Sequence, residues 1–171
     1  FVADHPESPQ MRSAAFHLGT YNYRKRDYDD ALDWFVKVDV YDLNEREKFE
    51  FLFKRGYCYF KMDSLKQAKR DFHEVKATDN KYSAPSKYYY AHLAYAEENY
   101  ETALTTFKKL LNDDDFGKIV PYYITQIYYL QEKNAEVISF GTPLLDSASV
   151  KRAPEIARII GEAYYRTERF K

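Results

Sequence analysis

The chain is poor in residues that interrupt helices or cross-link a fold. Its 171 residues include only five glycines, six prolines and one cysteine, Cys58. A single cysteine excludes an internal disulfide, and the scarcity of glycine and proline favours uninterrupted helices. The sequence also lacks a run of about 18 apolar residues, the length that a membrane-spanning helix needs. We therefore predict a helical chain with no membrane span.

An excess of charge of either sign is also missing. Lys and Arg together number 26 and Asp and Glu number 27, which gives a net charge of −1. Because surfaces that bind nucleic acids carry a basic excess, we predict no nucleic-acid partner. The chain begins at Phe1 without a methionine or a signal peptide, and we expect it to be a piece of a longer protein.

Patterns that carry catalysis or bind metal ions are absent. The four histidines lie in separate segments, at His5, His17, His73 and His92. None has Cys, Asp or Glu at a convincing metal-ligand spacing. The acidic run that starts at Asp113 has Ile124 where a calcium-binding loop needs its twelfth-position Glu. No base lies near Cys58 in the sequence, so its thiol is expected to be inert. The sequence predicts no enzyme, no cofactor and no metal site.

Aromatic residues are abundant instead, with 18 Tyr and 12 Phe. Seven of them lie in residues 49–75, whose apolar spacing predicts two helices joined by a tight turn. Gly56 and Ala68, one small residue on each helix, are expected to face each other and to let the two backbones approach closely. Ser64 and Gln67 have the spacing of a capping box at the start of the second helix.

This helical hairpin recurs along the chain with a period of 34–37 residues. The small residue of the first helix recurs at Gly19, Gly56, Ala91, Thr125 and Gly161. The small residue of the second helix recurs at Ala31, Ala68, Ala103 and Val137, and four residues later come Phe35, Phe72, Phe107 and Gly141. Prolines, which are tolerated in the first turn of a helix, mark the first helices at Pro9, Pro85, Pro121 and Pro154. The agreement of independent markers indicates a repeat.

We predict nine helices in five repeats, with no strand. The expected helices cover 9–25 and 28–40, 46–62 and 65–77, 84–97 and 100–112, 119–131 and 134–146, and 154–167. Residues 1–7 are expected to be the tail of a preceding repeat, and residues 8–171 to form the repeat domain. The fifth repeat lacks its second helix, so Ala157, Ile160 and Tyr164 are expected to be uncovered.

Two segments resemble the turn and second helix of the tetratricopeptide repeat (TPR) family: Arg26-Asp27-Tyr28-Asp29-Asp30-Ala31 and Glu98-Asn99-Tyr100-Glu101-Thr102-Ala103. The fourth repeat departs from the pattern at Val137, Gly141 and Pro143, and the proline should shorten or bend its second helix. The resemblance implies an all-α, right-handed solenoid of antiparallel helical hairpins that serves as a non-catalytic module for binding proteins or peptides.

The segment His5-Pro6-Glu7-Ser8-Pro9 resembles the spacers of TPR proteins in the bacterial cell envelope, such as outer-membrane assembly lipoproteins and cell-division coordinators. This second resemblance favours the periplasm or the cell envelope as the location, with the cytoplasm as the alternative. It also suggests a second function, in which the chain is a structural segment of a longer envelope scaffold.

An aromatic ladder is predicted along the first helices, with two rungs in each repeat. One rung, four residues after the small residue, comprises Tyr23, Phe60, Tyr95, Tyr129 and Tyr165. The other lies seven residues earlier, two helical turns away on the same face, and comprises Phe16, Phe53, Tyr88, Tyr122 and Arg158. The positions between the rungs vary: Thr20, Tyr57, His92, Gln126 and Glu162.

The TPR resemblance implies that the ladder lines a concave groove in which a partner segment binds. The predicted partner-binding residues are Phe16, Tyr23, Phe53, Tyr57, Phe60, Tyr88, His92, Tyr95, Tyr122, Tyr129 and Tyr165. The alternative is that the rings pack one repeat against the next, as aromatic stripes at helical spacing usually do. The many tyrosines favour partial exposure, because a tyrosine packs with its ring and keeps its hydroxyl group hydrogen-bonded. Both interpretations stay open at this point.

Overall fold

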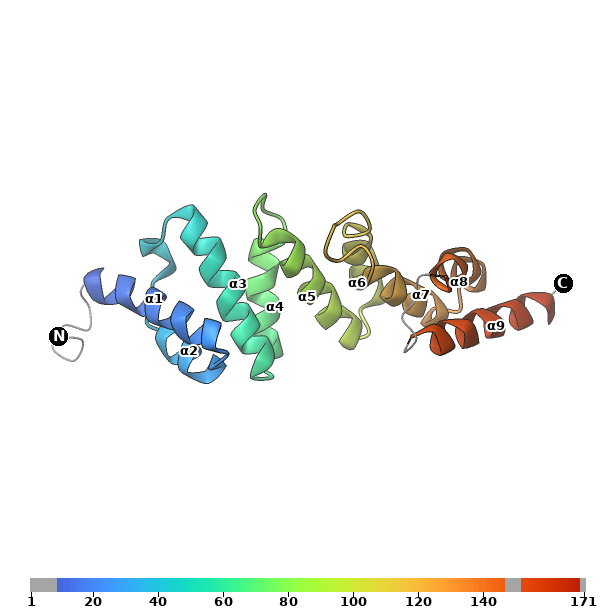
Figure 1. Ribbon diagram of the computed structural model, residues 1–171, viewed down its shortest axis with the longest axis horizontal. Helices are drawn as coiled ribbons and strands as arrows, with labels where there is room; N and C mark the ends of the chain where they lie inside the picture. Colours follow the sequence, from blue (N-terminus) through green and yellow to red (C-terminus); the bar gives the residue numbers. More distant parts are fainter. Residues whose placement is uncertain (1–8, 147–151, 170–171) are drawn as a thin grey trace. The chain divides into compact units, whose positions relative to one another are not determined.

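The computed structural model describes residues 9–146 and 152–169, and this part of the chain is helical without any β-strand (Figure 1). The α-helices are α1 (Pro9–Lys25), α2 (Tyr28–Phe35), α3 (Glu45–Lys61), α4 (Leu65–Val75), α5 (Ser83–Ala96), α6 (Tyr100–Lys108), α7 (Val120–Leu130), α8 (Asn134–Gly141) and α9 (Ala153–Arg169). Two 3₁₀ turns, η1 (Val40–Asp42) and η2 (Thr142–Leu144), follow α2 and α8. The predicted tail at residues 1–7 lies outside the described residues.

The first helix of each repeat agrees with its predicted range to within two residues, whereas the second helices end two to five residues early. The chain tightens after these second helices into turns of the i→i−3 type. The Val38 amide bonds to the Phe35 carbonyl at 3.2 Å, and the Leu110 amide bonds to the Phe107 carbonyl at 2.9 Å. In α8 the end comes at Gly141, and Pro143 lies in the 3₁₀ turn that follows, as its missing amide predicts.

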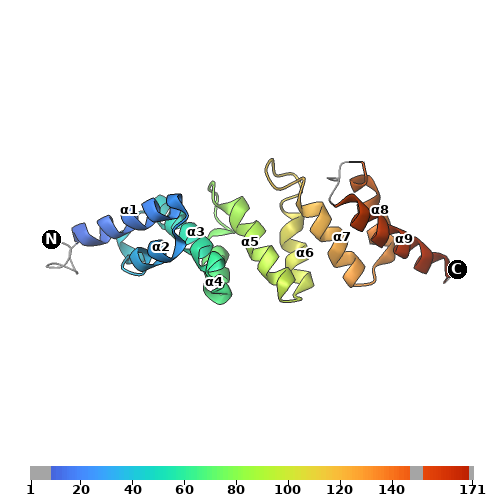
Figure 2. The same cartoon turned by 60° about the horizontal axis from the view of Figure 1, so that its bottom comes forward.

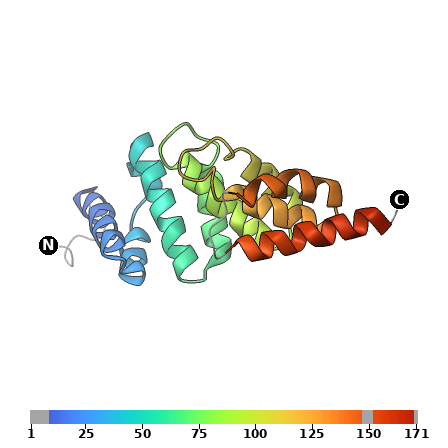
Figure 3. The same ribbon diagram turned by 45° about the vertical axis from the view of Figure 1, so that its right-hand side comes forward.

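The first of two compact units ends at Tyr90. Within it, α1 packs against α2 and α3, while α3 packs against α2 and α4 (Figure 3, blue to green ribbons). The rings of Phe35 and Phe51 meet edge to face at 5.5 Å in a core that also buries Val75. This packing joins helices of successive repeats, so no hairpin buries its apolar surface alone.

The second compact unit begins at Ala91. Its helix α7 packs against α6, α8 and α9, and α8 also packs against α9 (Figure 2, yellow to red ribbons). Its fully buried side chains include Ile124, Ile127, Val137 and Ile156. This core combines aliphatic side chains with the buried aromatic rings of Phe107 and Tyr128.

Close helix crossings explain the recurring small residues. A Cβ atom at Gly19 would lie 2.6 Å from the Phe35 ring, and one at Gly56 would lie 3.0 Å from Asp71 Cβ and 3.2 Å from the Phe72 ring. The contact predicted between Gly56 and Ala68 stays a prediction. The glycine makes room for residues one turn further along α4, because a Phe ring needs more space than a methyl group.

The fourth repeat reverses this arrangement. Thr125, which is fully buried, occupies the glycine position of α7, and Gly141 occupies the aromatic position of α8. A Cβ atom at Gly141 would lie 3.0 Å from both Thr125 Cγ2 and Ile160 Cγ1. The larger side chain on α7 thus meets a smaller one on α8, and the space freed at Gly141 admits Ile160 from α9.

Four helices end at a residue in the left-handed backbone conformation, which the sequence did not indicate. Arg26, Asp63, Glu98 and Glu132 have φ angles of 57–69°, in the left-handed region. Each is the residue at which the first helix of a repeat turns into the second. The Glu98 amide bonds to the Tyr95 carbonyl at 3.0 Å and the Asn99 amide bonds to the Ala94 carbonyl at 2.8 Å, which is the Schellman pattern.

The predicted capping box at Ser64 and Gln67 is wrong, because the Ser64 side chain makes no capping hydrogen bond. Its backbone is already fixed by the preceding turn, where the Ser64 amide bonds to the Tyr59 carbonyl at 2.9 Å. A capping box does form at the start of α3. There the Asn44 side chain accepts from the Glu47 amide at 3.0 Å, and the Glu47 carboxylate accepts from the Asn44 amide at 3.2 Å.

One face of α9 has no helix over it among the described residues. Ala157 is exposed, Tyr164 is 47% exposed, and a Cβ atom at Gly161 would have nothing within 4 Å. Ile160, which was expected to be uncovered with them, is only 5% exposed because it packs in the space at Gly141. The prediction is therefore wrong for Ile160 and agrees with the exposure of Ala157 and Tyr164.

Candidate functional site

The predicted ladder is neither core nor free surface. Nine of its eleven predicted binding residues are half-buried: Tyr23, Phe53, Tyr57, Phe60, Tyr88, His92, Tyr95, Tyr122 and Tyr129. Phe16, at 6% exposure, belongs to the core of the first compact unit, and Tyr165 is 57% exposed. The first six members along the chain, Phe16 to Tyr88, lie in the first unit, and the others lie in the second.

In the first unit the ladder rings form one cluster around Tyr57 of α3. The Tyr57 ring lies 5.7 Å from Tyr23 of α1 and 5.6 Å from Tyr28 of α2, edge to face in both cases. On its other side it meets Tyr89 of α5 at 5.3 Å. The rings therefore hold one another in fixed orientations across three successive repeats.

Tyr89 is the residue that the sequence prediction missed in this cluster. It follows ladder residue Tyr88 directly, and its ring stacks on Phe72 at 5.3 Å with 19° between the planes. It also packs against Phe60 at 5.2 Å. Burial, together with the neighbouring tyrosines, raises the pKa of Tyr89. The Tyr89 side chain lies between α3 and α4 and packs against the ladder residues Tyr57 and Phe60.

The same position recurs in other repeats as Lys54, Tyr89, Tyr123 and Ile159, and we call these the wedge residues. Each directly follows a residue of the rung that lies nearer the helix start, namely Phe53, Tyr88, Tyr122 or Arg158. In the sequence, the wedge position could have been recognised from the repeated doublets Tyr88-Tyr89 and Tyr122-Tyr123. The prediction used only the first residue of each doublet because a single repeat does not reveal which helix face its neighbour covers.

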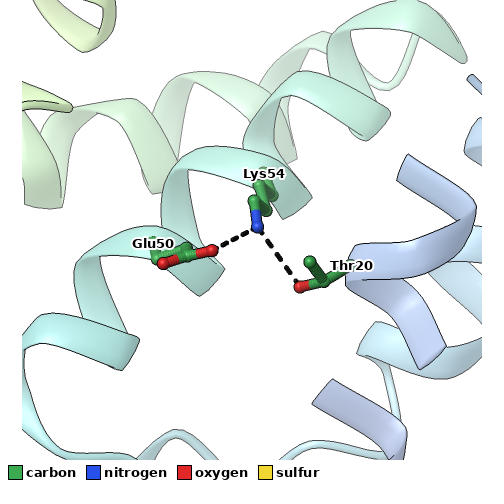
Figure 4. Close-up of polar contacts among 3 residues, drawn as sticks. All are labelled: Thr20, Glu50 and Lys54. Atoms are coloured by element: carbon green, nitrogen blue, oxygen red, sulfur yellow. Dashed lines mark hydrogen bonds and ion pairs between the residues drawn. The ribbon is translucent and has the colours of Figure 1, made fainter. Parts of the chain in front are cut away.

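Lys54 is an unusual wedge, because its charged side chain is only 7% exposed. Its Nζ atom forms an ion pair with Glu50 one turn earlier on α3 and donates to Thr20 Oγ1 of α1 at 3.3 Å (Figure 4). The ammonium group also lies 5.8 Å from the centre of the Tyr23 ring. Burial lowers the pKa of Lys54, and the Glu50 carboxylate opposes that effect. The hydrogen bond from Lys54 to Thr20 thus ties α3 to α1 beside the ladder, while the ion pair lies within α3.

In the second unit, Tyr123 is the aromatic wedge. Its ring stacks on Phe107 of α6 at 5.1 Å, with only 9° between the planes. The ladder residues His92 and Tyr95 of α5 approach it at 5.8 and 6.0 Å. Burial lowers the pKa of His92, which favours the neutral imidazole and argues against a charged role at this position.

Polar side chains replace part of the ring contacts further along the second unit. Gln126 accepts from the Tyr95 hydroxyl at 3.2 Å and donates to Tyr122 Oη and Glu155 Oε1, both at 2.8 Å. The Tyr122 hydroxyl donates to Glu155 Oε2 at 2.6 Å. Burial and this carboxylate raise the pKa of Tyr122 to about 12. The network fixes α5, α7 and α9 relative to one another within the second unit.

Tyr129 is the last half-buried residue of the ladder. Its hydroxyl donates to Glu162 Oε2 at 2.5 Å, and Arg158 Nη1 donates to Glu162 Oε1 at 2.5 Å. The guanidinium groups of Arg158 and Arg166 lie 5.6 and 5.5 Å from the centre of the Tyr129 ring. Arg158 and Arg166 give this end of the ladder a cationic rim.

The described side chains offer little for catalysis. No group of three His, Cys, Asp or Glu side chains in residues 9–146 and 152–169 is placed to bind a metal ion. Burial raises the pKa of Cys58 to about 12, so its thiol stays protonated and is a poor nucleophile. Among the helices described, none has both the length and the apolar character that crossing a membrane requires.

Comparison with known proteins identifies the fold. The chain resembles the crystal structure of nearly identical TPR-like repeats described as a putative kinesin light chain from Podosopora anserina, with a TM-score of 0.62 and 10% sequence identity over 95% of this chain and 90% of that one. The fold is that of TPR-like repeats. The crystal structure of a variant of the same protein matches equally well, over 97% of this chain and 89% of that chain. No protein-family model and no curated protein matches the sequence.

The TPR-like fold confirms the all-α helical-repeat class that the sequence predicted. At 10% identity the likeness concerns the fold alone. The five-repeat division, the envelope location and the roles of the ladder residues stay predictions.

Proposed function

We propose that the chain is a non-catalytic protein-binding module and that its aromatic ladder contacts a peptide or segment of a partner protein. The observation that carries this proposal is the half-burial of nine ladder side chains. Each ring is held in place by its neighbours but keeps part of its surface open. Rigid tyrosine side chains supply contact area at a small cost in conformational entropy, which suits a binding surface.

The hydrogen bonds of the ladder tyrosines support a positioning role. Gln126 and Glu155 hold the hydroxyl groups of Tyr95 and Tyr122, and Glu162 holds that of Tyr129. A tyrosine whose ring packs against its neighbours and whose hydroxyl group is hydrogen-bonded loses little conformational entropy when a partner binds. Phe16 offers no such surface, because its side chain is buried in the core.

The alternative is that the ladder only joins the repeats of a structural scaffold. Phe16 favours that role at its own position, because it packs in the core and offers no surface to a partner. The other ladder residues decide between the two functions. If the ladder binds a partner, substituting one of them should weaken binding even though the variant is folded.

A displayed peptide library selected on the immobilised protein tests the proposal. Selected peptides should lose most of their affinity for Tyr95→Ser and Tyr129→Ser, since interface tyrosines commonly contribute about 2 kcal/mol to binding. Tyr41→Ser is the matched control, because Tyr41 is 92% exposed and lies off the ladder. Circular dichroism and urea unfolding verify that each variant is folded. Peptides that bind both ladder variants and the control equally well would contradict the proposal.

A further inference from the structure

A pocket of about 630 Å³ lies in the first compact unit, beside the start of α3, and contains no ladder residue. Two segments line it. The start of α3 supplies Glu45, Arg46 and Phe49, and the turn between α4 and α5 supplies residues 78–82. Sites for small organic ligands commonly have volumes of about 300–1,000 Å³. The pocket is therefore large enough for such a ligand.

Two aromatic rings, those of Phe49 and Tyr82, form the apolar part of the pocket. Both side chains are half-buried and pack against the core of the first unit. The Tyr82 ring stacks on the Phe53 ring at 5.2 Å, with 27° between the planes, and Lys81 Nζ lies 4.9 Å from the centre of the Tyr82 ring. These contacts hold the rings in place, so they offer a ligand a fixed apolar surface.

Hydrogen bonds hold the turn formed by residues 78–82. The Thr78 hydroxyl donates to the Val75 carbonyl at 2.5 Å, and the Asn80 side chain donates to Thr78 Oγ1. The Asn80 side-chain oxygen accepts from the Tyr82 amide at 2.8 Å. On the other side of the pocket, a capping box fixes the first turn of α3. Because both segments are already ordered, little conformational entropy is lost when a ligand binds between them.

The charged side chains of the pocket are equal in number for each sign. Glu45 and Asp79 are negative, Arg46 and Lys81 are positive, and all four are exposed. None of the four forms an ion pair with another described residue. The carboxylates can accept hydrogen bonds and the two cations can donate them. A ligand without net charge that carries several hydroxyl groups can therefore use both kinds of side chain.

We propose that this pocket binds a neutral sugar in its pyranose form. One face of a pyranose ring consists mainly of C–H groups, whose hydrogens are attracted by the negative face of an aromatic ring. Hydroxyl groups surround the ring, and each of them both donates and accepts. The C–H face packs on Phe49 and Tyr82, while the hydroxyl groups bond to Glu45, Arg46 and Asp79. The proposal goes beyond the protein-binding function, because no ladder residue takes part.

Other ligands fit the pocket less well. An aromatic side chain of a partner would pack on the two rings, but it would displace water from charged groups without offering them hydrogen bonds. A free amino acid has one charge of each sign, whereas the pocket has two. An anion or a cation would meet a side chain of its own sign as closely as one of the opposite sign. Only the hydroxyl-rich ligand satisfies all four charged groups.

Saturation-transfer NMR of the whole chain with methyl glycosides tests the proposal. The probes are the methyl α- and β-glycosides of glucose, galactose and mannose. At least one should bind saturably at about millimolar concentration, and the ring protons of one face should receive most of the saturation. Because these probes are neutral, the dissociation constant should stay within about twofold between low and high salt. Tighter binding of maltose or cellobiose supports a sugar within a chain, and equal binding supports a single sugar.

Variants locate the site on the protein. Arg46→Ala and Asp79→Ala should each weaken binding of the glycoside about tenfold or more, because hydrogen bonds to charged groups are strong. Both residues are exposed, so the urea midpoint should not change. Arg70→Ala is the matched control, since Arg70 is exposed in the same unit but outside this pocket.

Several results would overturn the proposal. One is the absence of saturable binding for every glycoside at about 0.1 M. Another is a loss of affinity in Arg70→Ala as large as that in Arg46→Ala. Tighter binding of N-acetyl-phenylalaninamide or of free phenylalanine than of the best glycoside would also overturn it, if Arg46→Ala weakens that binding. In those two cases the pocket would be a site for an aromatic side chain or for an amino acid.

Discussion

Gly19 and Gly161 occupy the same position of their repeats, but Gly19 lies against a packed ring and Gly161 lies in open space. A Cβ atom at Gly19 would lie 2.6 Å from the buried Phe35 ring, whereas one at Gly161 would have nothing within 4 Å. The same substitution should therefore have effects of opposite sign, because overpacking destabilises a core while alanine is the better helix former.

We expect Gly19→Ala to lower the free energy of unfolding by about 1–3 kcal/mol, because the Phe35 ring must shift to admit the methyl group. Gly161→Ala, the matched control, should raise it by up to about 1 kcal/mol through helix propensity alone. Urea unfolding of both variants measures the difference. Destabilisation of equal size in both would show that the assigned crossing of α1 and α2 is wrong.

His92 should make stability depend on pH below neutrality. Burial lowers its pKa in the folded chain, so the unfolded chain binds the proton first as the pH falls. The stability that neutral His92 contributes is present above its unfolded pKa of about 6.5 and is lost as the pH falls through the folded value. The free energy of unfolding should therefore be smaller at pH 5.5 than at pH 7.5.

His92→Gln should reduce that pH dependence, whereas His17→Gln should leave it unchanged, because His17 is exposed on α1. Chemical denaturation at the two pH values provides the measurement for all three proteins. If His92→Gln keeps the full wild-type difference, another group causes the pH dependence.

At the scale of helices, the turns inside the repeats are held by left-handed residues that are not glycine. Glu98 has a φ of 60° and Glu132 a φ of 57°. A side chain in this region costs about 1 kcal/mol or more, which glycine avoids. At these helix ends, glycine would therefore give the folded chain a larger free energy of unfolding than the native residue does.

Glu98→Gly and Glu132→Gly should each raise the free energy of unfolding by about 0.5–1 kcal/mol. Glu136→Gly, at an exposed position inside α8, should lower it by about 1 kcal/mol because glycine is a poor helix former. Thermal and urea unfolding of the three variants tests the contrast. Destabilisation by glycine at residue 98 would contradict the turn geometry.

The helices could be predicted because their markers recur. Apolar spacing and the proline positions placed the first helices to within two residues, since one period applies to the whole chain. Single ends were harder to predict. Glutamate and arginine give no sign of a left-handed turn, and Ser64 resembles a cap although the backbone at its turn makes a side-chain cap unnecessary.

The sequence predicted that the ladder residues share one helix face, but it could not predict how far each ring is buried. Its spacing identifies one helix face, yet the burial of each ring depends on the next repeat. Phe16 is buried at 6% exposure, whereas Tyr57 stays half-buried although it contacts Tyr23 and Tyr89. Tyr89 and Lys54 were missed because tyrosine and lysine beside an aromatic rung look like ordinary helix residues until the adjoining helix is present.

At the scale of the molecule, the account separates two tasks within each compact unit. The wedge residues pack against helices of the preceding repeat, and the ladder residues are proposed to contact a partner, although the aromatic wedges Tyr89 and Tyr123 are half-buried as well. In α5 the two tasks fall on adjacent residues. Tyr89 packs against Phe53, Tyr57, Phe60 and Phe72, and Tyr88 stands next to it on the ladder.

Urea unfolding of Tyr89→Ala and Tyr88→Ala tests this separation most directly. Both variants make the same substitution in the same helix, so the change in helix propensity cancels between them. The account predicts that Tyr89→Ala lowers the free energy of unfolding by about 3 kcal/mol or more, as loss of a packed aromatic side chain does. Both side chains are half-buried, but Tyr88→Ala should lower it by only about 1 kcal/mol or less, because it leaves the ring contacts of Tyr89 with Phe60 and Phe72 in place. An equal or greater loss in Tyr88→Ala would contradict the account and make the ladder part of the structural core.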